Sequence, residues 1–119
     1  MRKQILTKEK IEQLYQLAKR VHFKKKSMAS AKDDAQFLYG INPGTAEGYF
    51  RNLSHLLAGE KYIRTMNEQA TRYFLDNIKI DFGQAALTAS LEAIRKHQNY
   101  YENKVSKQRY IDRILNDYQ

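Results

Sequence analysis

The sequence predicts an all-α fold: a compact single domain over residues 1–119, built from five to six helices. Three observations lead to this prediction. In most segments, apolar residues recur at the i, i+3, i+4, i+7 spacing of a helix with one buried face. Capping residues, glycines and a single proline separate these segments. No stretch alternates polar and apolar residues over the length of a strand, and 119 residues fit one domain of ordinary size.

The first predicted helix begins after Thr7, because threonine is a good N-terminal cap. Its buried face is formed by Ile11, Leu14, Tyr15, Ala18 and Val21. Lys24, Lys25 and Lys26 lie at its C-terminal end, where cations complement the helix dipole. This helix and the residues up to 32 make up a basic N-terminal region.

The second predicted helix begins at Ser30, with Asp33 at the position that completes a capping box. The residues on its core-facing side are Ala31, Ala35 and Leu38. Gly40 is expected to end this helix, because glycine readily adopts the left-handed conformation that follows a helix.

A turn at Asn42-Pro43-Gly44 leads into the third predicted helix. Proline fixes one backbone angle and glycine accepts a positive one, so this tripeptide strongly favours a turn. Thr45 is expected to cap the helix and Gly59 to end it. Its core-facing residues are Ala46, Tyr49, Phe50, Leu53, Leu56 and Leu57. The second and third helices form a helix-turn-helix-like pair, with a turn longer than the usual three to four residues or so.

The fourth predicted helix begins at Thr65, follows an extended segment over residues 60–64, and ends at Gly83. Glu68 lies three residues after Thr65 and completes a capping box. The apolar stripe of this helix consists of Ala70, Tyr73, Phe74 and Ile78.

Two further helices complete the predicted fold. Residues 84–102 are rich in alanine and leucine and predict one long helix. Ser106 is expected to cap a C-terminal helix over residues 106–119. The stripe of this last helix consists of Ile111, Ile114, Leu115 and Tyr118.

The net charge of +8 is unevenly distributed along the chain. Residues 1–32 contain ten Lys and Arg against two Glu, whereas residues 33–119 contain eleven basic and eleven acidic residues. Such a concentration of one sign suits a surface that binds a polyanion, because each neutralised phosphate releases counterions. The alternative is a solvated face that only keeps the protein soluble.

The sequence lacks the residue patterns that most kinds of enzyme catalysis require. The absence of cysteine excludes disulfides, thiol catalysis and cysteine-ligated zinc, and it fits a cytoplasmic protein. His22, His55 and His97 are far apart and form no metal-binding pair, so we expect no metal and no cofactor. Because no nucleophile–base pair or phosphate-binding glycine loop is present, the chain is predicted not to be an enzyme. No apolar run approaches the roughly 20 residues that span a bilayer, so no membrane partner is expected.

The third predicted helix carries polar residues suited to reading DNA bases. Arg51, Asn52 and His55 are expected to lie opposite its apolar stripe, together with Glu47. Arginine and asparagine make bidentate contacts with guanine and adenine, respectively. Glu47 would repel phosphate near the start of the helix. The alternative is simply a pair of packed helices.

A pattern spread over residues 39–102 points to a family. It consists of the helix start Thr45, Ala46, Glu47 and Tyr49, followed by LLAGEKY, RTMN, YFLDNIKIDFG and KHQNYYE. This pattern resembles the helical N-terminal module that precedes an HNH nuclease domain in bacterial restriction-type endonucleases. The resemblance implies a module that contributes to DNA recognition rather than cleavage. The chain contains no HNH motif, so the resemblance does not predict a nuclease.

Within that pattern, Lys61 and Arg64 flank Tyr62 and Ile63 just before a predicted helix start. Basic residues beside an aromatic residue and a helix N-terminus suit a phosphate clamp. Alternatively, the apolar pair fills the core while the two cations project into water.

Together these observations predict a non-catalytic DNA-binding module of a bacterial restriction or defence protein. The predicted DNA-binding residues are Lys19, Arg20, Lys24, Lys25, Lys26, Arg51, Asn52, His55, Lys61 and Arg64. The alternative is a protein-interaction or oligomerisation module, in which the C-terminal helix exposes its apolar stripe to a second copy or to a partner protein.

Overall fold

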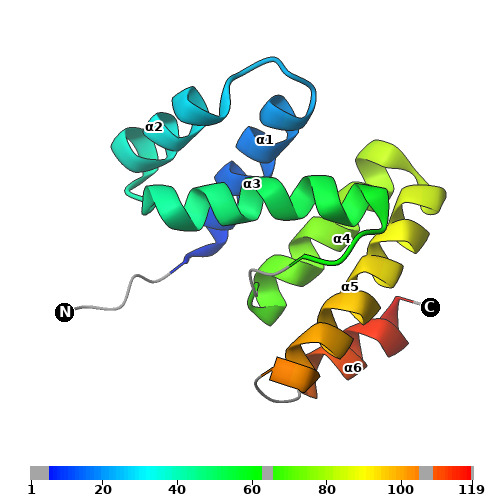
Figure 1. Cartoon of the computed structure of the whole chain (residues 1–119). Coiled ribbons are helices and arrows are strands. Elements are labelled where there is room, and N and C mark those ends of the chain that lie inside the picture. Colours follow the sequence, from blue (N-terminus) through cyan, green and yellow to red (C-terminus); the bar gives the residue numbers. More distant parts are fainter. Residues whose placement is uncertain (1–5, 63–65, 105–108, 119) are drawn as a thin grey trace. The chain divides into compact units, whose positions relative to one another are not determined.

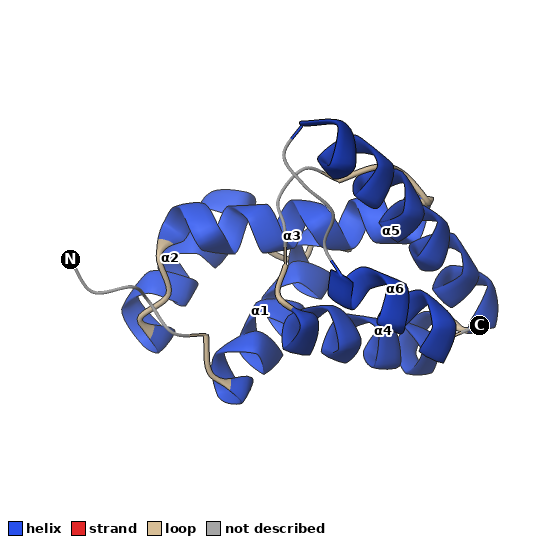
Figure 2. Cartoon of the chain, turned by 90° about the horizontal axis from the view of Figure 1, so that it is seen from below, coloured by secondary structure: helices blue, strands red, loops and turns tan. Residues whose placement is uncertain are grey.

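The computed structural model describes residues 6–62, 66–104 and 109–118, and these residues confirm the all-α prediction (Figures 1 and 2). None of them forms a strand. The described residues form six helices: α1 (Lys8–His22), α2 (Met28–Tyr39), α3 (Pro43–Ala58), α4 (Glu68–Phe82), α5 (Gln84–Lys104) and α6 (Arg109–Asp117). The described part of the chain has no helix both long enough and apolar enough to span a membrane.

The chain divides into two compact units, Met1–Leu53 and Ser54–Gln119, with the boundary inside α3. The single domain expected from the sequence stays a prediction.

In the first unit, α1 packs on α2 around a core that includes several small residues. Ala18, Ala31 and Ala35 are completely buried. Alanine allows two helix backbones to approach closely, since it has only a methyl group to accommodate. The other core residues of this unit are Ile11, Leu14, Tyr15, Leu17, Ile41, Ala46, Tyr49, Phe50 and Leu53.

The prediction that Leu38 faces the core is wrong, because its side chain is 67% exposed and its neighbour Phe37 is 76% exposed. Ile41, which follows the helix, is completely buried instead. The backbone N–H of Ile41 donates to the carbonyl of Ala35 at 2.9 Å, which folds the chain back toward α2. The turn residue therefore supplies the apolar side chain that was expected from the last helical turn.

The predicted start of α1 is confirmed, whereas the predicted starts of α2 and α4 are wrong. Thr7 Oγ1 accepts a hydrogen bond from the N–H of Lys10 at 3.2 Å. Ser27, not Ser30, caps α2, since its Oγ accepts from the N–H of Ser30 at 3.1 Å. Asn67 caps α4 by accepting from the N–H of Ala70 at 2.7 Å. The expected caps Thr65 and Ser106 lie outside the described residues.

Glycines end three helices as predicted. Gly40, Gly59 and Gly83 all have positive φ angles, a backbone region in which glycine has no Cβ penalty. At Gly59 the chain forms a Schellman turn: its N–H bonds to the carbonyl of Leu56, and the N–H of Glu60 bonds to that of His55.

In the second unit, α4, α5 and α6 pack against one another (Figure 1). The core residues of this unit are Leu56, Tyr62, Met66, Ala70, Phe74, Leu75, Ile78, Leu87, Leu91, Ala93, Ile94, Ile111 and Ile114. Ile111 and Ile114 belong to α6. The expectation that this helix exposes its apolar stripe is therefore wrong for both residues.

Polar contacts explain why α6 packs within its own unit. Arg72 of α4 pairs with Asp117 at 2.8 Å, and Arg113 of α6 pairs with Glu68 at 2.8 Å. The hydroxyl of Tyr118, just after α6, donates to Asp76 at 2.8 Å. Burial, followed by the hydrogen bond to Asp76, raises the pKa of Tyr118 to about 12. Because α4 carries matching charges along one side, α6 finds its partner in the same chain.

The second unit also buries a histidine. The ring of His97 stacks on Tyr62, with 4.2 Å between ring centroids and an interplanar angle of 11°. Its Nδ1 lies 2.7 Å from the carbonyl oxygen of Tyr62, which places a proton on Nδ1 as the donor. Burial lowers the pKa of His97, and the hydrogen bond to Tyr62 opposes that shift.

Candidate nucleic-acid interface

A turn of three residues, Gly40 to Asn42, joins α2 to α3. The longer turn expected from the sequence is therefore wrong, and so is the expected cap at Thr45. The side-chain Oδ1 of Asn42 accepts hydrogen bonds from the N–H groups of Gly44 at 2.8 Å and Thr45 at 3.2 Å. Asn42 is the cap, and Pro43 occupies the first helical position, where its missing N–H is harmless. The corrected length is that of a helix-turn-helix connection.

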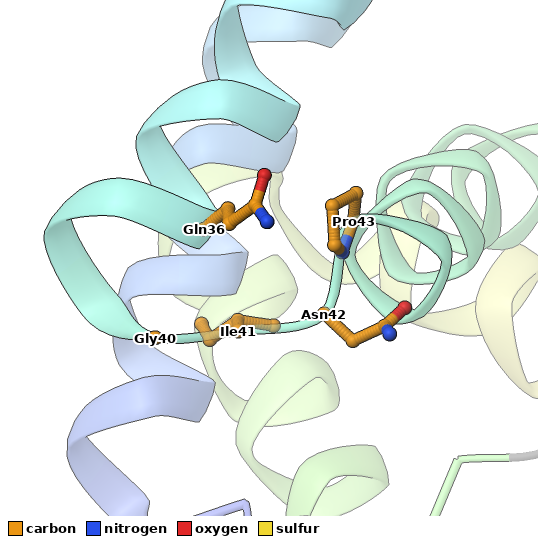
Figure 3. A pocket seen from close by; sticks show the side chains of 5 residues that line it. All are labelled: Gln36, Gly40, Ile41, Asn42 and Pro43. Atoms are coloured by element: carbon orange, nitrogen blue, oxygen red, sulfur yellow. The ribbon is translucent and has the colours of Figure 1, made fainter.

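The turn is held in place from both sides. Gly40 has a φ of +65°, and its N–H donates to the carbonyl of Gln36 at 3.1 Å. A surface hollow lies at this turn, lined by Gln36, Gly40, Ile41, Asn42 and Pro43, with the side chain of Asn42 directed toward the start of α3 (Figure 3). The connection is thus a defined structural feature.

The N-terminus of α3 has little capacity left to bind an anion through its backbone. Pro43 has no N–H, and those of Gly44 and Thr45 bond to the Asn42 side chain. The N–H of Ala46 donates to the Asn42 carbonyl at 2.9 Å. Since the donors of the first turn already have acceptors, a phosphate near this helix would depend on side chains.

Glu47 of α3 binds two cations, Lys32 of α2 and Arg51 of α3 itself. Its Oε1 accepts from Lys32 Nζ at 2.7 Å, and its Oε2 lies 2.9 Å from both Nε and Nη2 of Arg51. Hydrogen bonds from Lys32 and then Arg51 hold the pKa of Glu47 below its usual range. The expected repulsion of phosphate by Glu47 is thus offset by two neighbouring positive charges.

Exposed cations gather at the C-terminal end of α1. Arg20, Lys24 and Lys25 are all exposed. The N–H of Lys24 donates to the carbonyl of Val21 at 3.0 Å, and that of Lys25 to the carbonyl of Arg20 at 2.9 Å. These two bonds define a Schellman turn in which Lys24, with a φ of +58°, occupies the position that usually holds glycine. A side chain in this conformation costs roughly 1–2 kcal/mol.

The other two predicted cations of this region have partners in the first unit. Lys26 Nζ lies 2.5 Å from Asp34 Oδ2, and both side chains are half-buried. Lys19 Nζ lies 5.1 Å from the ring centroid of Tyr15, within cation–π distance. Between residues 19 and 26, exposed positive charge is therefore concentrated on Arg20, Lys24 and Lys25.

The predicted exposure of Asn52 is wrong, because its side chain is only 2% exposed. Asn52 lies three residues after Tyr49 and four before Leu56, and both are buried. Helical residues at these spacings share a face, so Asn52 belongs to the edge of the apolar stripe. Arg51, one residue earlier, has a side chain that is 61% exposed.

The remaining predicted DNA-binding residues belong to the second unit. His55 is half-buried on α3, and Lys61 is exposed in the segment that follows. Tyr62 is buried, as expected if it fills the core. Ile63 and Arg64 lie outside the described residues. Of the two cations in the predicted phosphate clamp, the structure therefore describes Lys61 alone.

Sequence reasoning missed Lys32 as a member of this site. Its pairing with Glu47 spans fifteen positions and requires the fold, so no local signal could have found it. The pairing of Glu47 with Arg51 has the i, i+4 spacing of a helical ion pair and was detectable in the sequence.

Comparison with known proteins yields no match: no protein-family model, no curated protein and no solved structure is significantly similar to this chain. Among the described residues, no group of three His, Asp or Glu side chains is arranged to bind a metal ion.

Proposed function

We propose that this chain is a non-catalytic DNA-binding module whose first unit binds a duplex. Arg20, Lys24 and Lys25 bind the phosphate backbone, and α3 enters the major groove. The observation that carries the proposal is the three-residue turn between α2 and α3, because it has the length of a helix-turn-helix connection.

The charge distribution supports the first unit as the binding part. Residues 1–53 contain eleven Lys and Arg against five Asp and Glu, a net charge of +6. Residues 54–119 contain ten basic and eight acidic residues, a net charge of +2. In the second unit, several charges pair with each other between α4 and α6. The first unit is therefore the part from which strong electrostatic attraction to a polyanion is expected.

The resemblance of residues 39–102 to the module ahead of HNH nuclease domains extends the proposal to a biological setting. We infer that the DNA binding serves a bacterial restriction or defence protein. The rival function, oligomerisation through α6, loses its main support because Ile111 and Ile114 are buried in their own unit.

Fluorescence anisotropy with a labelled random-sequence duplex, measured from about 50 to 200 mM salt, tests the proposal. The logarithm of the binding constant is expected to fall linearly with the logarithm of the salt concentration, with a slope of roughly −0.9 for each phosphate neutralised. Lys25→Glu should weaken binding and flatten this slope.

Lys8→Glu is the matched control. It makes the same charge change on an exposed residue at the opposite end of α1, about 20 Å away at the helical rise. Its effect on affinity should be smaller than that of Lys25→Glu. Binding that is absent, or equal losses for both variants, would contradict the proposed binding surface.

A further inference from the structure

The Arg51–Glu47 pair constrains how Arg51 can meet DNA. Both Nε and Nη2 of Arg51 lie 2.9 Å from the same carboxylate oxygen, Oε2 of Glu47. The other oxygen, Oε1, accepts from Lys32 of α2 at 2.7 Å. The carboxylate is therefore held from two helices, and it fixes one edge of the guanidinium plane.

A guanidinium group has five N–H donors in a rigid planar fork. The contacts with Glu47 use the edge formed by Nε and one hydrogen of Nη2. They leave the far edge, formed by Nη1 and the second hydrogen of Nη2. Two parallel donors of this kind match either O6 and N7 of guanine or two oxygens of a phosphate.

Two features of the site favour guanine over phosphate. The carboxylate of Glu47 partly neutralises the same guanidinium and so weakens its attraction for a phosphate, whereas O6 and N7 of guanine are uncharged acceptors. In addition, the first-turn N–H groups of α3 are bonded to Asn42 and offer a phosphate no assistance. The exposed Arg51 side chain is thus better placed for a base edge than for the backbone.

We propose that Arg51, oriented by Glu47, reads a guanine in the major groove and gives this module its sequence preference. The inference rests on the proposed DNA binding and deepens it. The cations at the end of α1 supply affinity for any duplex, Arg51 contacts the base, and Glu47 is a positioning residue. Without a role in reading bases, the pair is an ordinary i, i+4 contact on a helix surface.

Selection from a random-sequence duplex pool with the full chain tests this inference. Wild-type protein should enrich one position for guanine, with about a tenfold preference or more over the other bases. Arg51→Lys should weaken this enrichment, because a lysine ammonium lacks the rigid planar fork that Glu47 orients. The affinity of the same variant for the selected duplex should fall more than its affinity for the unselected pool, because lysine keeps the positive charge.

A selected duplex with 7-deazaguanine at the enriched position tests the atomic contact. This base lacks the N7 acceptor, so wild-type affinity should fall several-fold, whereas the affinity of Arg51→Lys should fall less. A duplex with 7-deazaguanine outside the selected site is the control.

Glu47→Gln separates positioning from simple charge. Removing the carboxylate charge should raise affinity for the unselected pool and lower the ratio of selected to unselected affinity. A merely structural pair would leave this ratio unchanged. Circular dichroism confirms that each variant is folded.

The possible failures are distinguishable. If the wild-type chain shows no salt-dependent binding to the unselected pool, the proposed function and this inference both fall. If it binds the pool without enriching guanine, or if 7-deazaguanine weakens Arg51→Lys as much as wild type, only this inference is overturned.

Discussion

Two helices of this chain end in the same hydrogen-bonded turn, one on a lysine and the other on a glycine. Lys24 follows α1 with a φ of +58°, and Gly59 follows α3 with a φ of +69°. The two backbone hydrogen bonds have the same pattern in both turns. The difference lies only in the side chain at the left-handed position.

This difference separates a structural requirement from a functional one. A Cβ at Gly59 would lie 3.4 Å from the carbonyl oxygen of Ala89, which is ordinary van der Waals contact, so glycine there satisfies the backbone conformation. The turn at Lys24 has the same backbone conformation but carries a strained, charged residue in an exposed position. Strain at a position where glycine would serve the fold better suggests that the charge itself is used.

The largest expected loss of stability comes from a substitution in the second unit. It tests whether DNA binding by the first unit is independent of the stability of the second. Ile114→Ala removes a completely buried side chain of α6 and should destabilise the second unit by about 2–4 kcal/mol. Urea unfolding followed by circular dichroism measures the loss. DNA affinity under folding conditions should change little, because the proposed binding surface lies in the first unit. A loss of affinity as large as that caused by Lys25→Glu would contradict the assignment.

The next largest effect makes the second turn resemble the first. Gly59→Lys adds the strain of the left-handed conformation and a Cβ in van der Waals contact with Ala89, so we expect a loss of about 1–2 kcal/mol. Gly40→Lys is the matched control, because Gly40 has a φ of +65° but no atom within 4 Å of an added Cβ. It should lose a similar amount, about 1–2 kcal/mol. A clearly larger loss at Gly59 would contradict the expectation that backbone strain alone sets the effect.

The opposite exchange makes the first turn resemble the second. Lys24→Gly removes the strain but adds backbone entropy to the unfolded state, for a net gain of about 0.5–1 kcal/mol. Its DNA affinity should nevertheless fall, with the salt slope reduced by about one. Lys24→Ala should show the same loss of affinity without the gain in stability. If Lys24→Gly binds as tightly as wild type, the strained lysine has no role in binding DNA.

The smallest expected effect is a pH dependence of the second unit. His97 has a lowered pKa in the folded state, so below the unfolded value of about 6.5 the unfolded chain binds more protons. Stability should therefore be fully present above that pH and fall as the pH decreases toward the folded pKa. The slope is less than about 1.4 kcal/mol per pH unit. Urea midpoints between pH 7 and pH 5, roughly the range in which histidine titrates, measure it.

His97→Gln should flatten this pH dependence, even if the variant is less stable overall. His22→Gln is the control and should retain it. A pH profile that is unchanged in His97→Gln would assign the effect to another group.

The sequence predicted the helices better than their starting points. Glycine ends were correct because a left-handed residue is a local requirement that few other residues meet. N-terminal caps were harder, since Ser27 and Ser30 compete within one turn, as do Asn42 and Thr45. Local patterns identify the turn in which a helix begins but do not fix which member of each pair is the cap.

The candidate site was less predictable than the fold. The basic end of α1 follows from composition, but the left-handed Lys24 contradicts the residue preference of its turn. The burial of Asn52 depends on how wide the buried face of α3 is, and the apolar residues of the helix do not predict that width. The pairing of Lys32 with Glu47 depends on the relative placement of two helices.

The turn at Lys24 has a consequence for proteolysis. Three consecutive lysines would make this segment a preferred site for trypsin in an extended chain. Here the N–H groups of Lys24 and Lys25 are bonded to helix carbonyls, and a protease must open that turn before it can bind the backbone. Cleavage in this segment would then report the opening equilibrium of the end of α1, and bound DNA should slow it.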